Sequence, residues 1–372
     1  MTSTEISEAP ATVAMPEPTE ALVGRLFEAA VGAVELCNIY LGIKLGLYGP
    51  LAAGPVTAKK LAEQTGCDER YLVEWLQGQA IAGLATVAGD DPATARFRLA
   101  EGAEPVLTEP TSPAYLGGLP LLLAAAGGVL PTLVEAFRTG KGVPYARYGP
   151  DAIEAQAALN RPAFVENLVP NWLPQVPDVW SRLRDSGNPA RIGDFGCGYG
   201  WSAIELAKAL PHLRVDGFDS DEASIVAARR HAAEAAVADR VMFEVRDLSD
   251  TTARWPDPYD VIFFFECVHD LPRPVEALAA ARRALRPEGT VIVMDERVAE
   301  TFTAPGDLVE RLFAAASPIW CLPQGLVGPD PQPVGSLMRP DRLRAIASQA
   351  GFSATEVLAI EHPTFRFYRL HP

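Results

Sequence analysis

The segment Asp194–Gly200 constrains the fold of this chain more than any other feature of the sequence. It reads DFGCGYG and overlaps the end of a short apolar stretch, Arg191–Phe195, that is predicted to be a strand. Glycines at the end of a strand let a ligand approach the backbone closely, and the N-terminus of a following helix presents free N–H groups. The helix predicted at Trp201–Leu210 supplies that N-terminus. The segment therefore predicts a strand, a ligand-binding loop and a helix in succession.

The rest of the C-terminal half repeats this alternation of strands and helices. Further strands are predicted at Leu213–Asp219, 241–245, 259–266 and 290–296, and a closing helix at Pro340–Ala350 precedes two sequential strands. Alternation of this kind is typical of a parallel, doubly wound sheet, with the final strands forming a hairpin at its edge. The expected fold class is α/β, with a mostly parallel, seven-stranded Rossmann-like sheet preceded by a mainly helical winged-helix domain.

Four parts are expected along the chain. Residues 1–20 are acidic and Pro-rich and predict a disordered tail, residues 21–110 a winged-helix domain, residues 111–185 a helical linker and lid region, and residues 186–372 the doubly wound domain. Residues 111–134 carry no charge but contain three prolines and two Gly-Gly pairs. These breakers argue against a continuous membrane-spanning helix, and we expect a buried interdomain or dimer-interface segment instead.

Charge and cysteine usage narrow the partners and the compartment. The chain has 47 Asp and Glu against 32 Lys and Arg, a net charge of −15, and no basic run that would attract a phosphate backbone. The five cysteines form no CxxC pair, and the first residues lack the basic and apolar regions of a signal peptide. We expect a cytoplasmic protein that binds neither nucleic acid nor membrane.

Two acidic residues at strand ends complete a candidate cofactor site. Asp219 ends the second strand, where a carboxylate can accept hydrogen bonds from both hydroxyls of a ribose, and Asp247 follows the third. Gly198, Gly200 and Ala203 also satisfy the dinucleotide pattern G-x-G-x-x-A, so the loop alone is compatible with a nicotinamide cofactor. Asp194 favours another ligand, because a carboxylate there repels a pyrophosphate and attracts an ammonium group.

From Arg191 to the C-terminus the chain resembles the class I methyltransferases that use S-adenosylmethionine (SAM). The matching pieces, in order, are IGDFGCGYG, VDGFDSD, VRDLSD, YDVIFFFECVHDL and LRPEGTVIVMDE. The resemblance implies SAM as the cofactor, with Asp219 at its ribose and Asp247 at its adenine. It places Asp194, Gly196, Gly198 and Gly200 at the methionine part. Leu248 and Glu266 complete the predicted cofactor set.

Residues 21–110 resemble the N-terminal winged-helix dimerisation domain of small-molecule O-methyltransferases, most closely an actinobacterial branch. The likeness rests on GPVTAKKLAEQTG and LVEWLQGQAIAGL. It implies a homodimer in which this domain closes the partner's substrate pocket and reads no DNA. The candidate recognition helix, DERYLVEWLQGQA, carries three acids and one arginine, which also disfavours a DNA-binding regulator.

His269 is the candidate general base. It follows the fourth strand, on the cofactor side of the sheet, and methyl transfer to oxygen requires removal of the hydroxyl proton. In O-methyltransferases of this architecture a histidine in an equivalent His-Asp pair is the base. By the same likeness Asp295 orients it. The second supporting acid of that family is missing, because Met338 stands near its place.

A metal site is the alternative. Some methyltransferases of similar build hold a metal with a His-Asp pair and another histidine, and they methylate the β-carbon of α-keto acids. His269 and Asp270 match that pair, whereas Cys321 lies where the third ligand is expected and His362 is the only other histidine that qualifies. Such a metal would act as a Lewis acid.

The positions of five side chains in the sequence predict that they contact the acceptor. Three candidates lie before the Gly-rich loop and two in the insertion after the fifth strand: Phe164, Asn167, Trp172, Trp320 and Met338. The most favoured function is SAM-dependent methylation of a small-molecule hydroxyl. The alternatives are metal-assisted C-methylation of an α-keto acid, a SAM-fold protein with a non-methylating or regulatory role, and a nicotinamide-dependent reductase.

Overall fold

The computed structural model describes residues 17–252, 254–255 and 257–372, and the chain divides into two compact units between Ala100 and Glu101. The division falls before the boundary predicted at residue 110, and the helical region 111–185 is part of the second unit. Of the predicted disordered tail, residues 1–16 lie outside the described residues. Residues 17–20 are the first turn of a helix instead.

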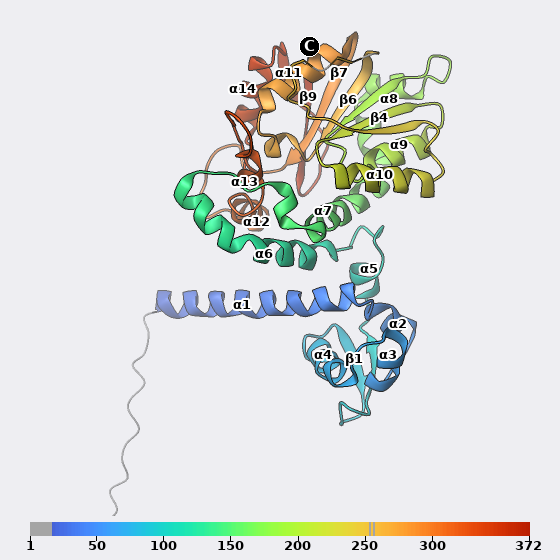
Figure 1. Cartoon of the computed structure of the whole chain (residues 1–372), viewed down its shortest axis with the longest axis vertical. Helices are drawn as coiled ribbons and strands as arrows, with labels where there is room; N and C mark the ends of the chain where they lie inside the picture. The colour runs from blue at the N-terminus through green and yellow to red at the C-terminus, as the bar shows by residue number, and fades with distance from the viewer. Residues whose placement is uncertain (1–16, 253, 256) are drawn as a thin grey trace, which may run out of the picture. The chain divides into compact units, whose positions relative to one another are not determined.

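The first unit begins with a long helix and ends with a β-hairpin (Figure 1). Its elements are α1 (Glu17–Lys44), α2 (Tyr48–Ala53), α3 (Ala58–Thr65), α4 (Glu69–Ile81), β1 (Ala85–Ala88) and β2 (Arg96–Leu99). The two strands pair antiparallel. The predicted order of helix, turn, helix and hairpin over residues 58–99 is therefore confirmed.

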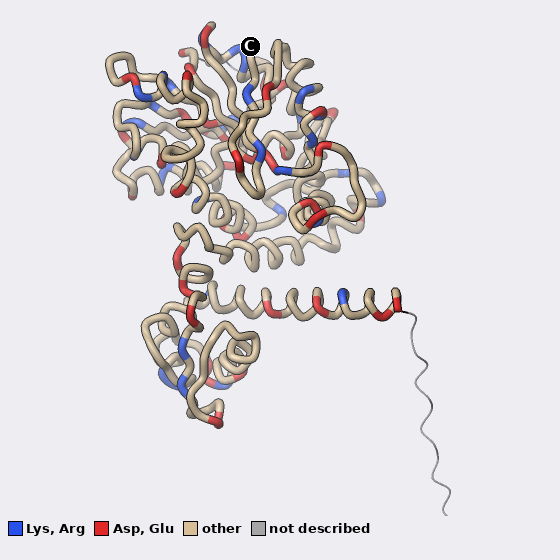
Figure 2. The backbone as a smooth tube through the Cα atoms, turned by 180° about the vertical axis from the view of Figure 1, so that it is seen from behind, with Lys and Arg blue, Asp and Glu red and all other residues tan. Residues whose placement is uncertain are grey.

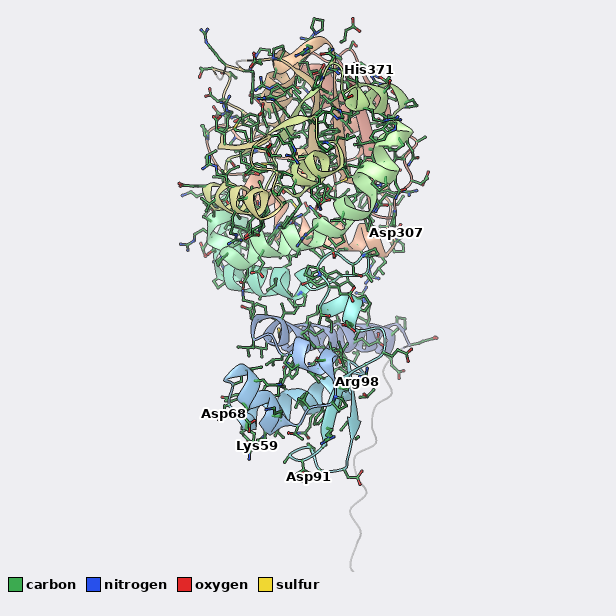
Figure 3. The ribbon with its side chains drawn as sticks, turned by 90° about the vertical axis from the view of Figure 1, so that its right-hand side faces the viewer. Lys59, Asp68, Asp91, Arg98, Asp307 and His371 are labelled. Atoms are coloured by element: carbon green, nitrogen blue, oxygen red, sulfur yellow. The ribbon has the colours of Figure 1, made fainter. Side chains whose placement is uncertain are left out.

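Capping side chains determine where α3 and α4 begin. The side chain of Thr57 accepts a hydrogen bond from the N–H of Lys60. The carboxylate of Asp68, labelled in Figure 3, accepts from the N–H groups of Arg70 and Tyr71. Each cap satisfies donors that the first helical turn leaves unpaired. The N-cap predicted at Asp68 is confirmed.

The second unit opens with helices. These are α5 (Glu104–Leu107), α6 (Gly118–Thr139), η1 (Tyr145–Tyr148), α7 (Pro150–Ala163), η2 (Phe164–Trp172), η3 (Leu173–Gln175) and α8 (Pro177–Arg184). The expectation that breakers interrupt the uncharged segment is wrong, because α6 runs unbroken through Pro131. Ala125, Val129 and Leu133, spaced four residues apart, pack into a common core, and this packing stabilises the helix around Pro131 and the Gly-Gly pair.

Two helices, α1 and α6, are long and apolar enough to cross a membrane, judged by length and composition alone. A buried helix of a soluble protein passes the same test, so the finding is weak support for a membrane span. Only 6% of the apolar window of α1 and 28% of that of α6 are buried. Burial of the uncharged segment at an interface between two copies stays a prediction.

A seven-stranded sheet forms the centre of the second unit (Figure 1). The strands are β3 (Arg191–Phe195), β4 (Arg214–Asp219), β5 (Val241–Val245), β6 (Tyr259–Phe265), β7 (Leu285–Glu296), β8 (Ala354–Val357) and β9 (Phe365–His371). Their order is β5-β4-β3-β6-β7-β9-β8, with β8 and β9 antiparallel at one edge. The predicted fold class is confirmed, except that the turn expected at RPEG lies inside β7.

Helices cover both faces of this sheet. Helices α9 (Trp201–Ala209) and α10 (Glu222–Glu234) pack in one core, and α11 (Pro274–Ala284) and α14 (Pro340–Gln349) pack in the other. The remaining elements of this region are η4 (Val268–Asp270), α12 (Leu308–Ala316) and α13 (Cys321–Gly325). Strand β6 shows why two layers are needed. Val261 and Phe263 enter one hydrophobic core, whereas Ile262 and Phe264 enter the other. Strands buried on both faces read as continuous apolar runs, as in the sequence FFF at the end of β6.

Glycine is required where β3 turns into α9. Gly200 has a φ of +77°, and a Cβ added there would overlap the ring of Phe243 on β5. Gly196 has a φ of +80°, and its added Cβ would lie 2.6 Å from the sulfur of Cys267. The loop can follow this path only because neither residue has a side chain.

Replacing Gly200 by alanine should lower the free energy of unfolding of the second unit by about 1–3 kcal/mol, because the new Cβ is strained and overpacked. Urea unfolding of the full-length chain, followed by circular dichroism, measures this loss. Gly127→Ala is the control, since nothing lies within 4 Å of a Cβ added at that helical position. It should leave stability unchanged or raise it by about 0.5–1 kcal/mol. A Gly200→Ala chain as stable as the wild type would contradict this account of the turn.

Candidate active site

A cavity of about 500 Å³ lies at the carboxyl ends of β3, β4, β5 and β6. Each strand contributes residues that were predicted from the sequence: Gly196 and Gly198 after β3, Asp219 on β4, Asp247 and Leu248 after β5, and Glu266 after β6. The strand order reverses between β3 and β6, which is where an open α/β sheet leaves a crevice. The topology therefore brings together six predicted residues that are distant in sequence.

Asp219 holds the Gly-rich loop in place. One carboxylate oxygen accepts a hydrogen bond from the N–H of Gly198 at 2.9 Å, and the other accepts from the N–H of Asp221 at 2.9 Å. Burial raises the pKa of Asp219 above its ordinary value, and these backbone donors oppose that rise. Each oxygen keeps a further lone pair for a ligand hydroxyl. Asp219 thus both shapes the loop and presents its carboxylate to the cavity.

Asp194 and Gly200 lie behind the loop and do not line the cavity. The carboxylate of Asp194 is 1% exposed and accepts a hydrogen bond from the hydroxyl of Ser202, in the first turn of α9. Burial raises the pKa of Asp194 to about 7. Its direct contact with a methionine moiety stays a prediction, whereas its contact with α9 is a structural one.

Asp247 and its neighbours form the other end of the cavity. One oxygen of Asp247 accepts from both the N–H and the hydroxyl of Ser249, at 2.8 and 2.6 Å. Arg273 donates to the Ser249 hydroxyl at 2.7 Å, and Arg246 pairs with Glu244 at 2.6 Å. The two arginines that line the cavity are therefore already engaged here.

His269 lies on η4, directly after β6, and is surrounded by carboxyl groups. Its Nδ1 lies 2.8 Å from Asp295 and 2.9 Å from Glu296, and its Nε2 lies 3.3 Å from Asp270. The imidazole is 2% exposed. Burial alone would lower the pKa of His269, but the three acids outweigh it and hold the pKa well above 6.5. The surrounding acids therefore favour the protonated form of the ring.

The three acids around His269 differ in charge. Burial favours the neutral form of Asp295, but His269 and a hydrogen bond from Glu296 hold its pKa below the usual value. Burial raises the pKa of Glu296 well above its usual value, which favours the protonated form of this carboxyl group. The predicted contact of Asp295 with His269 is present. Glu296 supplies the second acid that the sequence seemed to lack, from the next residue of the same strand.

Asp270 is the member of this cluster that faces the cavity. It lines the cavity, whereas His269 lies behind it. Burial raises the pKa of Asp270, and the charge on His269 opposes that rise. The side chain of Cys321, from α13, hydrogen-bonds Asp270. Of this histidine–aspartate pair, the aspartate is therefore the member that a ligand in the cavity can reach.

The predicted acceptor contacts divide into two groups. Phe164 and Trp320 line the cavity. Asn167 instead accepts a hydrogen bond from Asn171, and Trp172 packs against Phe367 in the core. Met338 is fully buried in the other core, against the opposite face of the sheet. Trp172 and Met338 are packed in the cores and Asn167 is held by Asn171, and none of the three is among the residues that line the cavity. Contact of these three side chains with an acceptor stays a prediction.

Several cavity residues were missed from the sequence. Tyr145 on η1, Asn160 on α7 and Gln324 on α13 also line the cavity. They come from helices that carry no motif, and no spacing pattern marks their side chains. Their place at the site follows only from how the helical segments fold over the strand ends.

Comparison with known proteins identifies the class. Residues 194–291 match the family model described as "Methyltransferase domain". The ubiquinone biosynthesis O-methyltransferase of Bordetella pertussis is 26% identical over 181 residues, which cover 48% of this chain and 69% of that protein. Together with the glycine loop and Asp219, these matches define a SAM-dependent methyltransferase.

Solved structures show the same fold over nearly the whole chain. An O-methyltransferase family protein from Burkholderia thailandensis aligns with a TM-score of 0.69 at 18% identity and covers 96% of this chain and 98% of its own. Human N-acetylserotonin methyltransferase in complex with SAM aligns with a TM-score of 0.64 at 18% identity, covering 97% and 99%. The chain is a SAM-dependent methyltransferase of the class I fold, with a largely helical N-terminal region.

Asp219→Asn should weaken binding of S-adenosylhomocysteine about tenfold or more, because an amide nitrogen replaces one of the acceptors that hold the loop and face the ribose. Isothermal titration calorimetry of the full chain measures this change. Glu222→Gln is the matched control, since it removes the same charge from an exposed position at the start of α10. Unchanged affinity in Asp219→Asn would exclude Asp219 from the cofactor site.

Proposed function

We propose that this methyltransferase transfers the methyl group of SAM to a hydroxyl oxygen of a small molecule. The observation that carries the proposal is the His269–Asp270 pair at the acceptor side of the cavity. A relative named as a ubiquinone biosynthesis O-methyltransferase and structural neighbours named as O-methyltransferases support transfer to oxygen.

The chemistry asks little of the protein beyond alignment and proton removal. The acceptor oxygen attacks the methyl carbon, the bond from that carbon to the sulfonium breaks, and S-adenosylhomocysteine leaves. The hydroxyl proton must be taken up as the new bond forms. We propose that His269 is the general base, with its Nδ1–H donated to Asp295 so that Nε2 is the basic atom. Asp270 lies between Nε2 and the cavity, and its carboxylate relays the hydroxyl proton of the acceptor to Nε2.

The acids around His269 set the pH dependence. Only the neutral imidazole accepts a proton, and the pKa of His269 is held well above 6.5. The rate of methyl transfer should therefore rise with pH, with a midpoint above 6.5. Asp270→Asn removes one of the acids that raise this pKa, so the midpoint should move to lower pH. NMR titration of labelled histidine in the S-adenosylhomocysteine complex measures the pKa without any acceptor.

His269→Asn should lower methyl transfer by about 10²–10⁴-fold, the usual contribution of a general base, while leaving SAM binding intact. The measurement uses methyl-deuterated SAM and a panel of small phenols that includes catechol, with mass spectrometry to locate the label. His371→Asn is the control, because that histidine lies at the end of β9 and pairs with Glu356 (Figure 3). Label found on carbon would contradict the proposal, as would full activity of His269→Asn.

A second candidate function has one specific observation in its favour. Ligand atoms of His269, Asp270 and Cys321 all lie within 4.8 Å of one another. Imidazole nitrogen, carboxylate oxygen and thiolate sulfur together suit a transition metal, and Nδ1 of His269 is supported by a carboxylate as in many metal sites. This arrangement supports metal-assisted C-methylation of an α-keto acid. Loss of activity on chelation and in Cys321→Ser, restored by a divalent metal only in the wild type, would select it over O-methylation.

We further propose that two copies of the chain associate through α1. This helix exposes large apolar side chains at helical spacing, among them Leu26, Phe27 and Val34, and Phe27 is 71% exposed. Acidic residues occur at intervals along this otherwise apolar helix, as Figure 2 shows. With a net charge of −15, the chain is poorly suited to an anionic membrane surface. A second copy of the chain is therefore the favoured partner for the exposed apolar side chains of α1.

Phe27→Glu should convert the dimer to a monomer, because it places a charge in the apolar face that the second copy covers. Size-exclusion chromatography with light scattering measures the mass in solution. Ile81→Glu, which changes an 88% exposed apolar residue on α4, should stay dimeric. A wild-type chain that is monomeric and sediments with lipid vesicles would contradict the proposal and assign α1 to a membrane.

We also propose a cytoplasmic location. All five cysteines are free, and two of them, Cys197 and Cys267, adjoin the cofactor loop. Free thiols at these positions are compatible with a reducing compartment.

A further inference from the structure

Glu266 occupies a backbone position that favours glycine. It directly follows β6, where its N–H donates to the carbonyl of Met294 at 2.7 Å, and its φ is +53°. A residue with a side chain is strained in this left-handed region. Such strain is commonly kept where the side chain serves a site. The side chain of Glu266 lines the cavity.

The carboxyl group of Glu266 is only partly satisfied. The side chain of Asn160 hydrogen-bonds it, but Oε2 is buried and has no hydrogen-bond partner among the residues that the structure describes. Burial raises the pKa of Glu266 to about 7, and the charge on His269 opposes that rise. A buried carboxylate oxygen without a donor is costly, so this atom is expected to meet a ligand.

The charges near Glu266 belong to the acceptor side of the cavity. Glu266 lies three residues before His269, in the segment that joins β6 to η4, and His269, Asp270 and Asp295 are the charged groups that most affect it. The sequence predicts Glu266 in the cofactor set, and its position before His269 and Asp270 also puts it within reach of an acceptor hydroxyl at that pair. The ligand that satisfies Oε2 is therefore the methyl acceptor.

No protein cation is free to pair with Glu266 among the described residues that line the cavity. Arg246 is held by Glu244, and Arg273 by Ser249 and Asp247, at the other end of the cavity. The remaining acids at the acceptor end, above all Asp270, add negative charge. An anionic acceptor would be repelled there, and a neutral one without a donor would leave Oε2 unpaired.

Aromatic side chains also line the cavity. Tyr145, Phe164, Phe265 and Trp320 line the same cavity as Glu266 and Asp270. Aromatic faces attract organic cations, and the attraction strengthens when water is excluded. Carboxylates and aromatic rings together form a site suited to a protonated amine.

We propose that the methyl acceptor is a hydroxylated amine whose protonated amino group pairs with Glu266 while its hydroxyl faces Asp270 and His269. The inference rests on the proposed function, in that it names the substrate class for the same site. It also weighs against an α-keto acid, whose carboxylate would enter a cavity already lined by Glu266 and Asp270.

Three phenols of similar size and different charge test the inference: tyramine, tyrosol and 4-hydroxyphenylacetate. Each is titrated by calorimetry into the full-length protein saturated with S-adenosylhomocysteine. Tyramine should bind about tenfold tighter than tyrosol, and 4-hydroxyphenylacetate should bind most weakly. Glu266→Gln should reduce tyramine affinity to that of tyrosol and leave S-adenosylhomocysteine affinity unchanged.

Two further variants make the test decisive. Glu266→Gly removes the carboxylate and relieves the left-handed backbone, so it should fold at least as well as the wild type and also lose the preference for tyramine. Glu234→Gln removes an exposed charge on α10 and should keep the preference.

The inference is overturned if tyramine binds no tighter than tyrosol, if no probe binds at millimolar concentration, or if the preference survives both changes at Glu266. It is also overturned if these changes weaken S-adenosylhomocysteine binding and leave the ratio of tyramine to tyrosol affinity intact. Its failure is separable from that of the proposed function. Binding selectivity reports on Glu266, whereas the position of the deuterated methyl group reports on O-methylation.

Discussion

The reversal of strand order beside β3 is the constraint on which the rest of the structure depends. The chain adds β4 and β5 on one side of β3 and then returns to add β6 and β7 on the other. The loops after β3 and β6 consequently diverge, and a crevice opens between them. The glycine loop, Asp219, Glu266 and His269 all leave strands at this edge. If the first two bind the cofactor and the last two contact the acceptor, as proposed, the two ligands meet in this crevice.

The crevice contains several carboxyl groups and few positively charged side chains. Asp219, Glu266 and Asp270 face the cavity, and Asp295 and Glu296 lie behind His269. Buried carboxylates need donors or cations. Backbone N–H groups donate hydrogen bonds to Asp219, and the ring of His269 hydrogen-bonds Asp295. The remaining acids are suited to charges that arrive with ligands, first the sulfonium of SAM and then a cation on the acceptor. The same acids also raise the pKa of His269.

The rigid parts of the site and its less constrained parts come from different elements. The cofactor loop is fixed by backbone geometry, since Gly196 and Gly200 adopt conformations that leave no room for a side chain. The acceptor end is built from helices η1, α7 and α13, which pack over the strand ends through side chains such as Trp320 against Tyr148. Chains of this fold can keep the first part and vary the second. Specificity in this chain is accordingly expected to reside in residues such as Asn160 and Glu266.

The sequence by itself determined the doubly wound sheet, because strands buried on both faces must be apolar throughout and helices between them must be amphipathic. It also determined the cofactor loop and Asp219, since left-handed turns require glycine and the residue that ends β4 must lie beside them. The tertiary structure decided what pattern alone could not. Met338 and Trp172 lie in the core, Glu296 supplies the second acid at His269, and Asp270 stands between that histidine and the cavity. These outcomes depend on contacts between segments that are distant in the sequence. Helix α6 likewise continues through Pro131, because packing against a core outweighs the low helix propensity of proline.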